Sequence, residues 1–204
     1  MEYLRLTIRN ESETLRKTID VLKEGKIAAF PTETFYALGA IYDNDDALKR
    51  LYELKRRPFE KAIPIIVGYK TQISSLAGNV PKEAEELMDR YWPGPLTIVL
   101  DAQEGLNTYL TAGTGKIAVR VPGESFALNL AREAGFPITA TSANPSGVPP
   151  AVDAQDVLKF FGETIDLIVD GGHTFGIEPS TIVEIVKGEV KTLRKGRIGK
   201  VTLG

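Results

Sequence analysis

The chain has 204 residues, of which 43% are hydrophobic and 25% are charged, and its formal net charge is -2. These values are typical of a single globular domain, 1–204, and its slight acidity gives no bulk attraction to nucleic acid. The absence of cysteine excludes disulfides and Cys-based metal sites. No apolar run is long enough to span a membrane and residues 1–10 lack the apolar core of a signal peptide, so we expect a cytoplasmic protein without membrane contact.

Helices and strands alternate in the first half of the chain. Hydrophobic spacing predicts a helix over 11–24, a strand over 26–30, a helix from 44 or 45 to 57, a strand over 63–67, a helix over 80–91 and a strand over 96–100. Pro31 ends the first strand because proline has no N–H to donate to a neighbouring strand. Pro58 ends the second helix, since the residue before a proline disfavours helical geometry.

The second half continues the pattern and ends in two adjacent strands. It predicts a strand over 117–121, a helix over 125–133, a short strand over 137–140, a polar loop over 141–147, a helix over 154–161, a strand over 167–169 and a hairpin of 181–186 with 190–193. The alternation indicates an α/β fold with a twisted β-sheet flanked by helices. The terminal hairpin predicts that this sheet is mixed and not purely parallel.

Polar residues follow several of the apolar strands. Thr32, Glu33 and Thr34 appear where the strand over 26–30 would leave the sheet, and similar loops occur at 141–146 and 171–180. In open α/β sheets, ligands bind beyond the carboxyl ends of the strands. The alternative for Thr32–Thr34 is a turn that forms only local side-chain-to-backbone hydrogen bonds.

Basic residues cluster near the expected ends of elements. The clusters are Lys55, Arg56, Arg57 and Lys61; Arg120; and Arg194, Lys195 and Arg197. Such residues are typical of sites for polyphosphates or carboxylates. Lys55–Arg57 could equally be helix-end cations that complement the helix dipole. Arg120 lies within an apolar run, so it either faces solvent by strand alternation or pairs with an anionic group, and we favour a ligand.

Several common catalytic motifs are absent. The chain has no Gly-x-x-x-x-Gly-Lys-Ser/Thr phosphate loop and no Gly-x-Gly-x-x-Gly fingerprint. Its one histidine, His173, cannot form a His-based metal cluster, and it stands in a Gly-Gly-His loop that is more typical of a structural residue. An enzyme with this sequence would therefore work by positioning reactants and stabilising charge.

Six motifs in order carry a resemblance to a known family. They are Pro-Thr-Glu-Thr-x-Tyr-x-Leu-Gly at 31–39, Lys-x-Arg-Pro at 55–58, Trp-Pro-Gly-Pro-Leu-Thr at 92–97, Ala-Val-Arg-Val-Pro at 118–122, Ser-Ala-Asn-Pro-Ser-Gly at 142–147 and Pro-Ser-Thr-Ile-Val at 179–183. Together they closely resemble the YrdC-like family of threonylcarbamoyl-AMP synthases. The length of the chain resembles the short, TsaC-type form, which lacks the additional C-terminal domain of longer members.

This resemblance implies a concave, basic cleft and a reaction that joins L-threonine, bicarbonate and ATP, with Mg2+ accompanying the ATP. The product would pass to a tRNA-modifying transferase complex that acts on the adenosine next to the anticodon. By motif position, Thr34, Arg120 and Ser180 would bind L-threonine, with Arg120 on its carboxylate. The ATP site would consist of Lys55, Arg57, Lys61, Ser142, Asn144 and Arg194, with Lys55 and Arg57 also catalytic. Glu33 is only a guess as a metal ligand.

Some positions differ from the usual family pattern, and two alternatives stay open. Phe35 and Ala37 stand where Val and Gly are frequent, Ile66 where some members have a threonine-contacting His, and Lys61 where some have Asn. One alternative is a module that binds RNA, if only weakly, or a nucleotide without turnover. The other is a paralogue with a changed amino-acid or carbamoyl substrate. We further expect Lys55→Ala to reduce turnover more than stability, because an exposed lysine at a helix end contributes little to folding.

Overall fold

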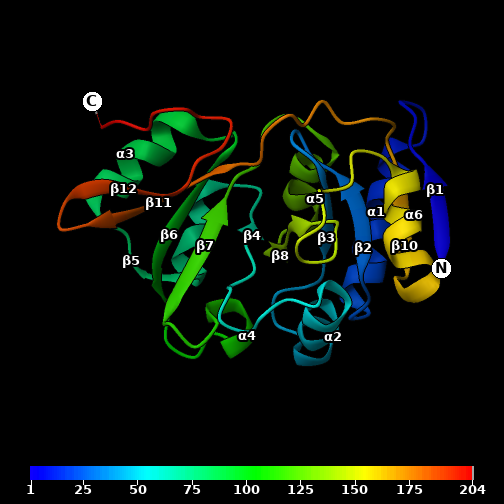
Figure 1. The fold of residues 1–204 in the computed structure, drawn as a ribbon, viewed down its shortest axis with the longest axis horizontal. Coiled ribbons are helices and arrows are strands. Elements are labelled where there is room, and N and C mark those ends of the chain that lie inside the picture. Colours follow the sequence, from blue (N-terminus) through cyan, green and yellow to red (C-terminus); the bar gives the residue numbers. More distant parts are fainter. Residues whose placement is uncertain (204) are drawn as a thin grey trace.

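The structure, a computed structural model, describes residues 1–203 and has two mixed β-sheets that lie beside each other (Figure 1). The α/β class and the mixed strand directions expected from the sequence are confirmed. The strands are divided between two sheets, however, where the sequence predicted one. Among residues 1–203, no helix combines the length and the apolar character needed to cross a bilayer.

The five-stranded sheet contains both ends of the first βαβ connection. Its order is β1 (Glu2–Arg5), β10 (Leu167–Asp170), β2 (Ala28–Pro31), β3 (Tyr36–Gly39) and β9 (Thr141–Ser142). The first three strands are parallel, and β3 is antiparallel to both of its neighbours, β2 and β9. Pro31 is the last residue of β2, as predicted, but β1 and β3 were not predicted. β1 is largely exposed and has no apolar run, and β3 directly follows the polar residues 32–34 in a stretch interpreted as a loop.

The seven-stranded sheet is built around two long central strands. Its order is β12 (Glu189–Arg194), β11 (Thr181–Val186), β6 (Leu96–Ala102), β7 (Lys116–Arg120), β4 (Ile65–Ile66) and β8 (Ile138–Thr139), with β5 (Ala77–Asn79) paired to β6. The hairpin of β11 and β12 turns at Lys187 and Gly188, both with positive φ, as the sequence predicted. The predicted strand over 63–67 is only two residues long in β4.

Within residues 1–203, six α-helices and two 3-10 helices surround the sheets. They are α1 (Glu11–Lys23), α2 (Asp45–Lys55), α3 (Lys82–Tyr91), α4 (Thr108–Thr111), α5 (Phe126–Ala134), α6 (Ala154–Phe161), η1 (Lys70–Ser75) and η2 (Gly162–Thr164). The helix expected from residue 44 or 45 begins as α2 directly after Asn44, whose side chain caps it by accepting a hydrogen bond from the N–H of Ala47 at 2.9 Å. Four of these helices cover the five-stranded sheet, two on each face. In β2, Ala28 and Phe30 pack with α1 and α5, whereas Ala29 packs with α2 and α6.

One short segment connects the two sheets. Ile138 and Thr139 form β8 of the seven-stranded sheet, and two residues later Thr141 and Ser142 form β9 of the five-stranded sheet. The N–H of Thr139 also donates to the carbonyl oxygen of Ala40 at 2.9 Å, directly after β3. The segment read as a polar loop therefore begins with a strand, and the sheets are held edge to edge at this point.

Candidate functional site

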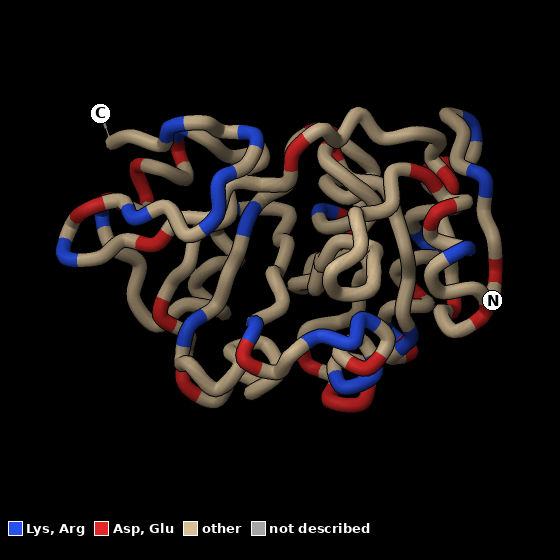
Figure 2. Tube along the Cα trace, in the orientation of Figure 1, with Lys and Arg blue, Asp and Glu red and all other residues tan. Residues whose placement is uncertain are grey.

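A pocket of about 250 Å³ lies between the two sheets and collects residues from both. Six of the nine site residues predicted from the sequence line it: Thr34, Arg57, Arg120, Ser142, Ser180 and Arg194. The lining includes three arginines and no acidic residue. Figure 2 shows that basic and acidic residues are otherwise interspersed along both halves of the chain. The positive charge is therefore a property of this pocket and not of a whole face.

Strand alternation explains which side chains of the seven-stranded sheet reach the pocket. Val119 of β7 belongs to the hydrophobic core formed with α3, while its neighbours Ala118 and Arg120 line the pocket. In β6, Ile98 is in the core and Thr97 lines the pocket. One face of this sheet is thus core and the other is a wall of the site, which places Arg120 within an apolar run without burying it in the core.

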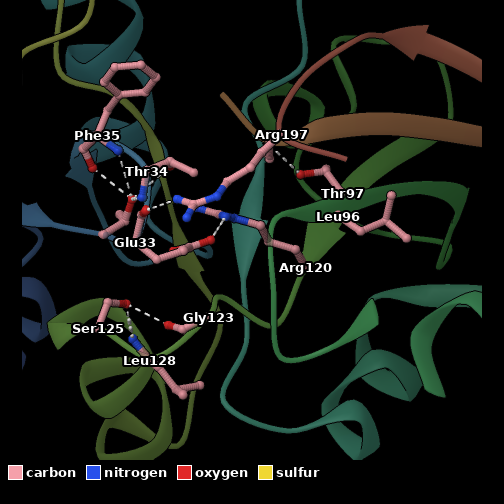
Figure 3. A network of polar contacts seen from close by, with 12 residues as sticks. Glu33, Thr34, Phe35, Leu96, Thr97, Arg120, Gly123, Ser125, Leu128 and Arg197 are labelled. Atoms are coloured by element: carbon pink, nitrogen blue, oxygen red, sulfur yellow. Dashed lines mark hydrogen bonds and ion pairs between the residues drawn. The ribbon is translucent and has the colours of Figure 1, made fainter. Parts of the chain in front are cut away.

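Arg120 forms an ion pair with Glu33, and Figure 3 shows the two side chains pointing toward each other. Their side chains are 8% and 12% exposed, respectively. Of the two alternatives considered for Arg120, the solvent-facing one is wrong because the side chain is buried, and pairing with an anionic group is confirmed with Glu33 as the anion. Its contact with a ligand stays a prediction. The second carboxylate oxygen of Glu33, Oε2, is buried and has no hydrogen-bond partner among the described residues.

The Thr32–Phe35 loop is a turn with local hydrogen bonds and is also part of the pocket. The hydroxyl of Thr32 accepts from the N–H groups of Thr34 and Phe35 at 3.0 and 3.2 Å and donates to the carbonyl of Phe35 at 2.7 Å. It lies 2.9 Å from the hydroxyl of Thr34. Because Thr32, Thr34 and Phe35 line the pocket, the local bonds hold their side chains in place at the site.

Ser180 and Arg194 form the opposite side of the pocket. Arg194 donates from Nε and Nη2 to the carbonyl oxygen of Ser180 at 3.1 and 2.8 Å, and from Nη2 to its hydroxyl at 2.9 Å. That hydroxyl lies 3.0 Å from the hydroxyl of Thr97. Burial lowers the pKa of Arg194, and the positive charges of Arg120 and Arg57 lower it further. Arg57 and Arg120 are thus both close enough to Arg194 to repel it, which favours an anion beside Arg194.

Arg57 organises the loop that follows α2. Its Nε donates to the carbonyl of Lys61 at 2.8 Å and its Nη2 to the carbonyl of Ala62 at 2.7 Å, and burial lowers its pKa. Lys61 is exposed and does not line the pocket. Its assignment to the ATP site therefore stays a prediction.

Lys55 is buried, with 2% of its surface exposed, which corrects our expectation of an exposed helix-end lysine. Its ammonium donates to the carbonyl oxygens of Ser142 and, at 2.8 Å, of Asn144. Burial, and secondarily the charge of Arg57, lowers its pKa from 10.5 to about 7. The premise that Lys55→Ala would leave stability nearly unchanged is wrong, because the buried carbonyl of Asn144 would lose its donor and the carbonyl of Ser142 would keep only the N–H of Asn144.

Asn144 shapes the same loop from its other end. Its amide Nδ2 donates to the carbonyls of Pro145 and Val148 at 3.1 and 2.6 Å, and its Oδ1 is buried without a partner among the described residues. Neither Lys55 nor Asn144 lines the pocket, although both lie directly behind Ser142, which does. Any contact of these two residues with ATP stays a prediction.

Several residues of the site were not assigned from the sequence. Thr97 lies within a motif quoted above and was passed over, whereas Arg197 was noted only as part of a basic cluster. Arg197 donates to the carbonyl of Glu33 at 3.0 Å.

Gly176 belongs to the segment 171–180 that runs from β10 to β11 across the top of the molecule (Figure 1). A Cβ at Gly176 would lie 1.7 Å from the carbonyl oxygen of Thr34, so only glycine allows this crossing.

The described residues do not form a resident metal site. Among residues 1–203, no group of three or more His, Asp or Glu side chains could hold a metal ion. One carboxylate oxygen of Glu33 is paired with Arg120, and its role as a metal ligand stays a prediction.

Comparisons with known sequences agree on one family. The family model Sua5_yciO_yrdC, described as "Telomere recombination", matches residues 20–196. The threonylcarbamoyl-AMP synthase of Pyrococcus abyssi is 40% identical over 189 residues, which are 92% of this chain and 55% of that protein. The synthase of Bacillus subtilis is 41% identical over 182 residues, or 88% of this chain and 52% of that protein. The chain thus spans about half the length of the curated relatives it matches.

A solved structure agrees with these relatives. The crystal structure of P. abyssi Sua5 complexed with L-threonine matches with a TM-score of 0.88 and 39% identity. The match covers 96% of this chain and 57% of that one. The whole fold described above, including both sheets, is therefore similar to one part of a longer protein.

Proposed function

Because the chain belongs to the Sua5/YciO/YrdC family, we propose that it is a threonylcarbamoyl-AMP synthase. The reaction would join L-threonine, bicarbonate and ATP into threonylcarbamoyl-AMP and release pyrophosphate and water. The names of the relatives and the L-threonine complex of the structural neighbour support this proposal.

The observation that carries the proposal is the pocket with three arginines and several hydroxyl groups. In it, Arg120 would bind the carboxylate of L-threonine, and the hydroxyls of Thr34 and Ser180 would contact its polar groups. The volume of about 250 Å³ is smaller than the ~300–1,000 Å³ of pockets for drug-sized ligands. It suits an amino acid better than a whole nucleotide, so ATP would lie at the side of the pocket lined by Arg57 and Ser142 and would extend beyond it.

The proposed reaction requires the protein mainly to position the reactants and to supply positive charge. The neutral amine of threonine forms a C–N bond to the carbon of bicarbonate, and a C–O bond breaks as water leaves, which gives a carbamate. A carbamate oxygen then forms a bond to the α-phosphorus of ATP as the bond to pyrophosphate breaks. Arg57 and Arg194 would stabilise the negative charge of the phosphates during this transfer. Mg2+ bound to ATP would neutralise further phosphate charge.

Lys55 has an indirect part in this proposal. Its ammonium contacts two backbone carbonyls behind Ser142, so it would hold the 142–146 loop in place for the nucleotide. A cytoplasmic location and a downstream complex that transfers the threonylcarbamoyl group to tRNA belong to the same proposal.

Pyrophosphate release tests the reaction directly. The purified chain is incubated with ATP, Mg2+ and bicarbonate, with and without L-threonine, and pyrophosphate is measured over time. We expect release that requires both L-threonine and bicarbonate. Failure to release pyrophosphate with any amino acid, combined with RNA binding that weakens steeply with salt, would contradict the synthase and favour a binding module.

A second candidate function is a synthase with a different amino-acid substrate. Phe35 and Ala37, which depart from the usual family pattern, both line the pocket, so they could change its shape at the substrate. Ile66 is fully buried and does not line the pocket, which makes it a weaker candidate for such a change. Comparing L-threonine with L-serine, L-valine and glycine in the same assay separates the two candidates, because only a changed specificity gives faster release with another amino acid.

A further inference from the structure

The proposed reaction gives no role to Glu33, although Glu33 is a buried carboxylate in contact with the site. It lies in the loop between β2 and β3, in the five-stranded sheet, and its partner Arg120 lies at the end of β7, in the other sheet. The pair is separated by 87 residues in the sequence. It therefore connects the two walls of the pocket at the residue predicted to bind a carboxylate.

The contact leaves much of the guanidinium group free to bind a ligand. One nitrogen, Nη1 of Arg120, meets Oε1 of Glu33, and a guanidinium has five N–H donors in a planar fork. Arg120 lines the pocket, whereas Glu33 does not. Glu33 therefore contacts Arg120 from outside the pocket, and the carboxylate does not occupy the place where a ligand would bind.

The surroundings of Glu33 hold its side chain and its backbone in place. A Cβ on Gly123 would lie 3.0 Å from Cγ of Glu33, so the chain at Gly123 packs directly on this side chain. Arg197 donates to the carbonyl oxygen of Glu33 at 3.0 Å, and Figure 3 shows Arg120 and Arg197 converging on this loop. Because both the side chain and the backbone of Glu33 are held in place, its carboxylate can hold the Arg120 side chain in one orientation.

We propose that Glu33 is a positioning residue that orients Arg120 toward the amino-acid side of the pocket. This inference rests on the proposed function, because it assigns Arg120 to the substrate carboxylate. Without Glu33, the long Arg120 side chain would sample several rotamers and would be drawn less firmly away from Arg57 and Arg194. The substrate would then have to order the guanidinium on binding, which weakens its affinity.

The test compares three single variants with the unmodified protein. Glu33→Gln removes the charge at nearly constant shape, and Glu33→Asp keeps the charge but shortens the side chain by one methylene. Glu184→Gln is a matched control, because Glu184 is an ion-paired carboxylate of similar exposure, 17%, that contacts Lys116 and does not line the pocket. L-threonine binding is measured by calorimetry, and the KM values for L-threonine and ATP are measured by pyrophosphate release.

We expect Glu33→Gln to raise the Kd and KM for L-threonine by about 10- to 100-fold, with the KM for ATP changed by less than about twofold. Glu33→Asp should give a smaller rise, and Glu184→Gln should change neither KM. If Glu33→Gln does not fold, Glu33→Asp carries the test. Its smaller rise should likewise affect the KM for L-threonine and not the KM for ATP.

Three results would overturn the inference. Unchanged threonine affinity in the Glu33 variants would show that Arg120 needs no partner. Tighter binding would show that Glu33 competes with the substrate, and an equal rise in both KM values would show general damage to the site. If the unmodified protein neither binds L-threonine nor releases pyrophosphate with it, the proposed function has failed, which is a different result from a failure of Glu33 alone.

Discussion

Replacing Lys55 with methionine removes a buried ammonium group while keeping a side chain of similar length. In the structure Lys55 is 2% exposed, and its ammonium donates to the backbone carbonyls of Ser142 and Asn144. Burial lowers its pKa from 10.5 to about 7, with a smaller contribution from Arg57. The folded protein therefore holds the proton of Lys55 less tightly than the unfolded chain does.

The size and sign of the effect follow from proton linkage. A pKa lowered from 10.5 to about 7 corresponds to about 5 kcal/mol of unfavourable free energy for the charged form. Below pH 7 this penalty is fully present. As pH rises from about 7 to 10.5, the folded state has lost the proton and the unfolded state still binds it, so stability increases. The two carbonyl acceptors favour the ammonium and so raise its pKa, which narrows the pH range over which stability increases. We therefore expect an average rise of about 1 kcal/mol per pH unit.

Urea unfolding at several pH values measures this slope. We expect the free energy of unfolding of the unmodified protein, minus that of Lys55→Met, to rise by about 2 kcal/mol between about pH 7.5 and pH 9.5. Taking the difference cancels the other groups that titrate in this range. A difference that stays constant across the range would refute the reasoning, because it would show that Lys55 keeps an ordinary pKa in the folded protein.

Three further substitutions test other parts of the site. Arg120→Ala should raise the KM for L-threonine by about 100-fold and leave ATP binding largely intact, and unchanged threonine kinetics in the pyrophosphate assay would remove Arg120 from the site. Gly176→Ala should lower the free energy of unfolding by about 1–3 kcal/mol, because its Cβ would collide with the carbonyl of Thr34. Gly199→Ala, a control with open space around its Cβ, should not lower it. Equal urea midpoints for the two variants would contradict this reasoning. Arg57→Lys should raise the KM for ATP by about tenfold, because a lysine cannot contact both loop carbonyls; a normal KM would show that the loop does not depend on this fork.

The sequence determined most of the local structure of this protein. Hydrophobic period and capping residues located five of the six α-helices, including the start of α2 at Asn44, and the hairpin at Lys187 and Gly188. These features depend on residues within a few positions of one another, so the pattern is visible in one dimension. The polar loops and basic clusters also indicated where a ligand site would form, and six of the nine predicted site residues line one pocket.

Only the tertiary structure decided how those residues are used. Lys55 donates to Ser142, and Arg120 pairs with Glu33, and in each contact the two residues are 87 positions apart. No local sequence pattern reports such contacts. The division into two sheets likewise depends on residues 138–142, which pair with different sheets at their two ends. Period and composition show which face of a strand is polar. What that face meets is set by the packing of distant segments, because buried charges must find partners wherever the fold brings them together.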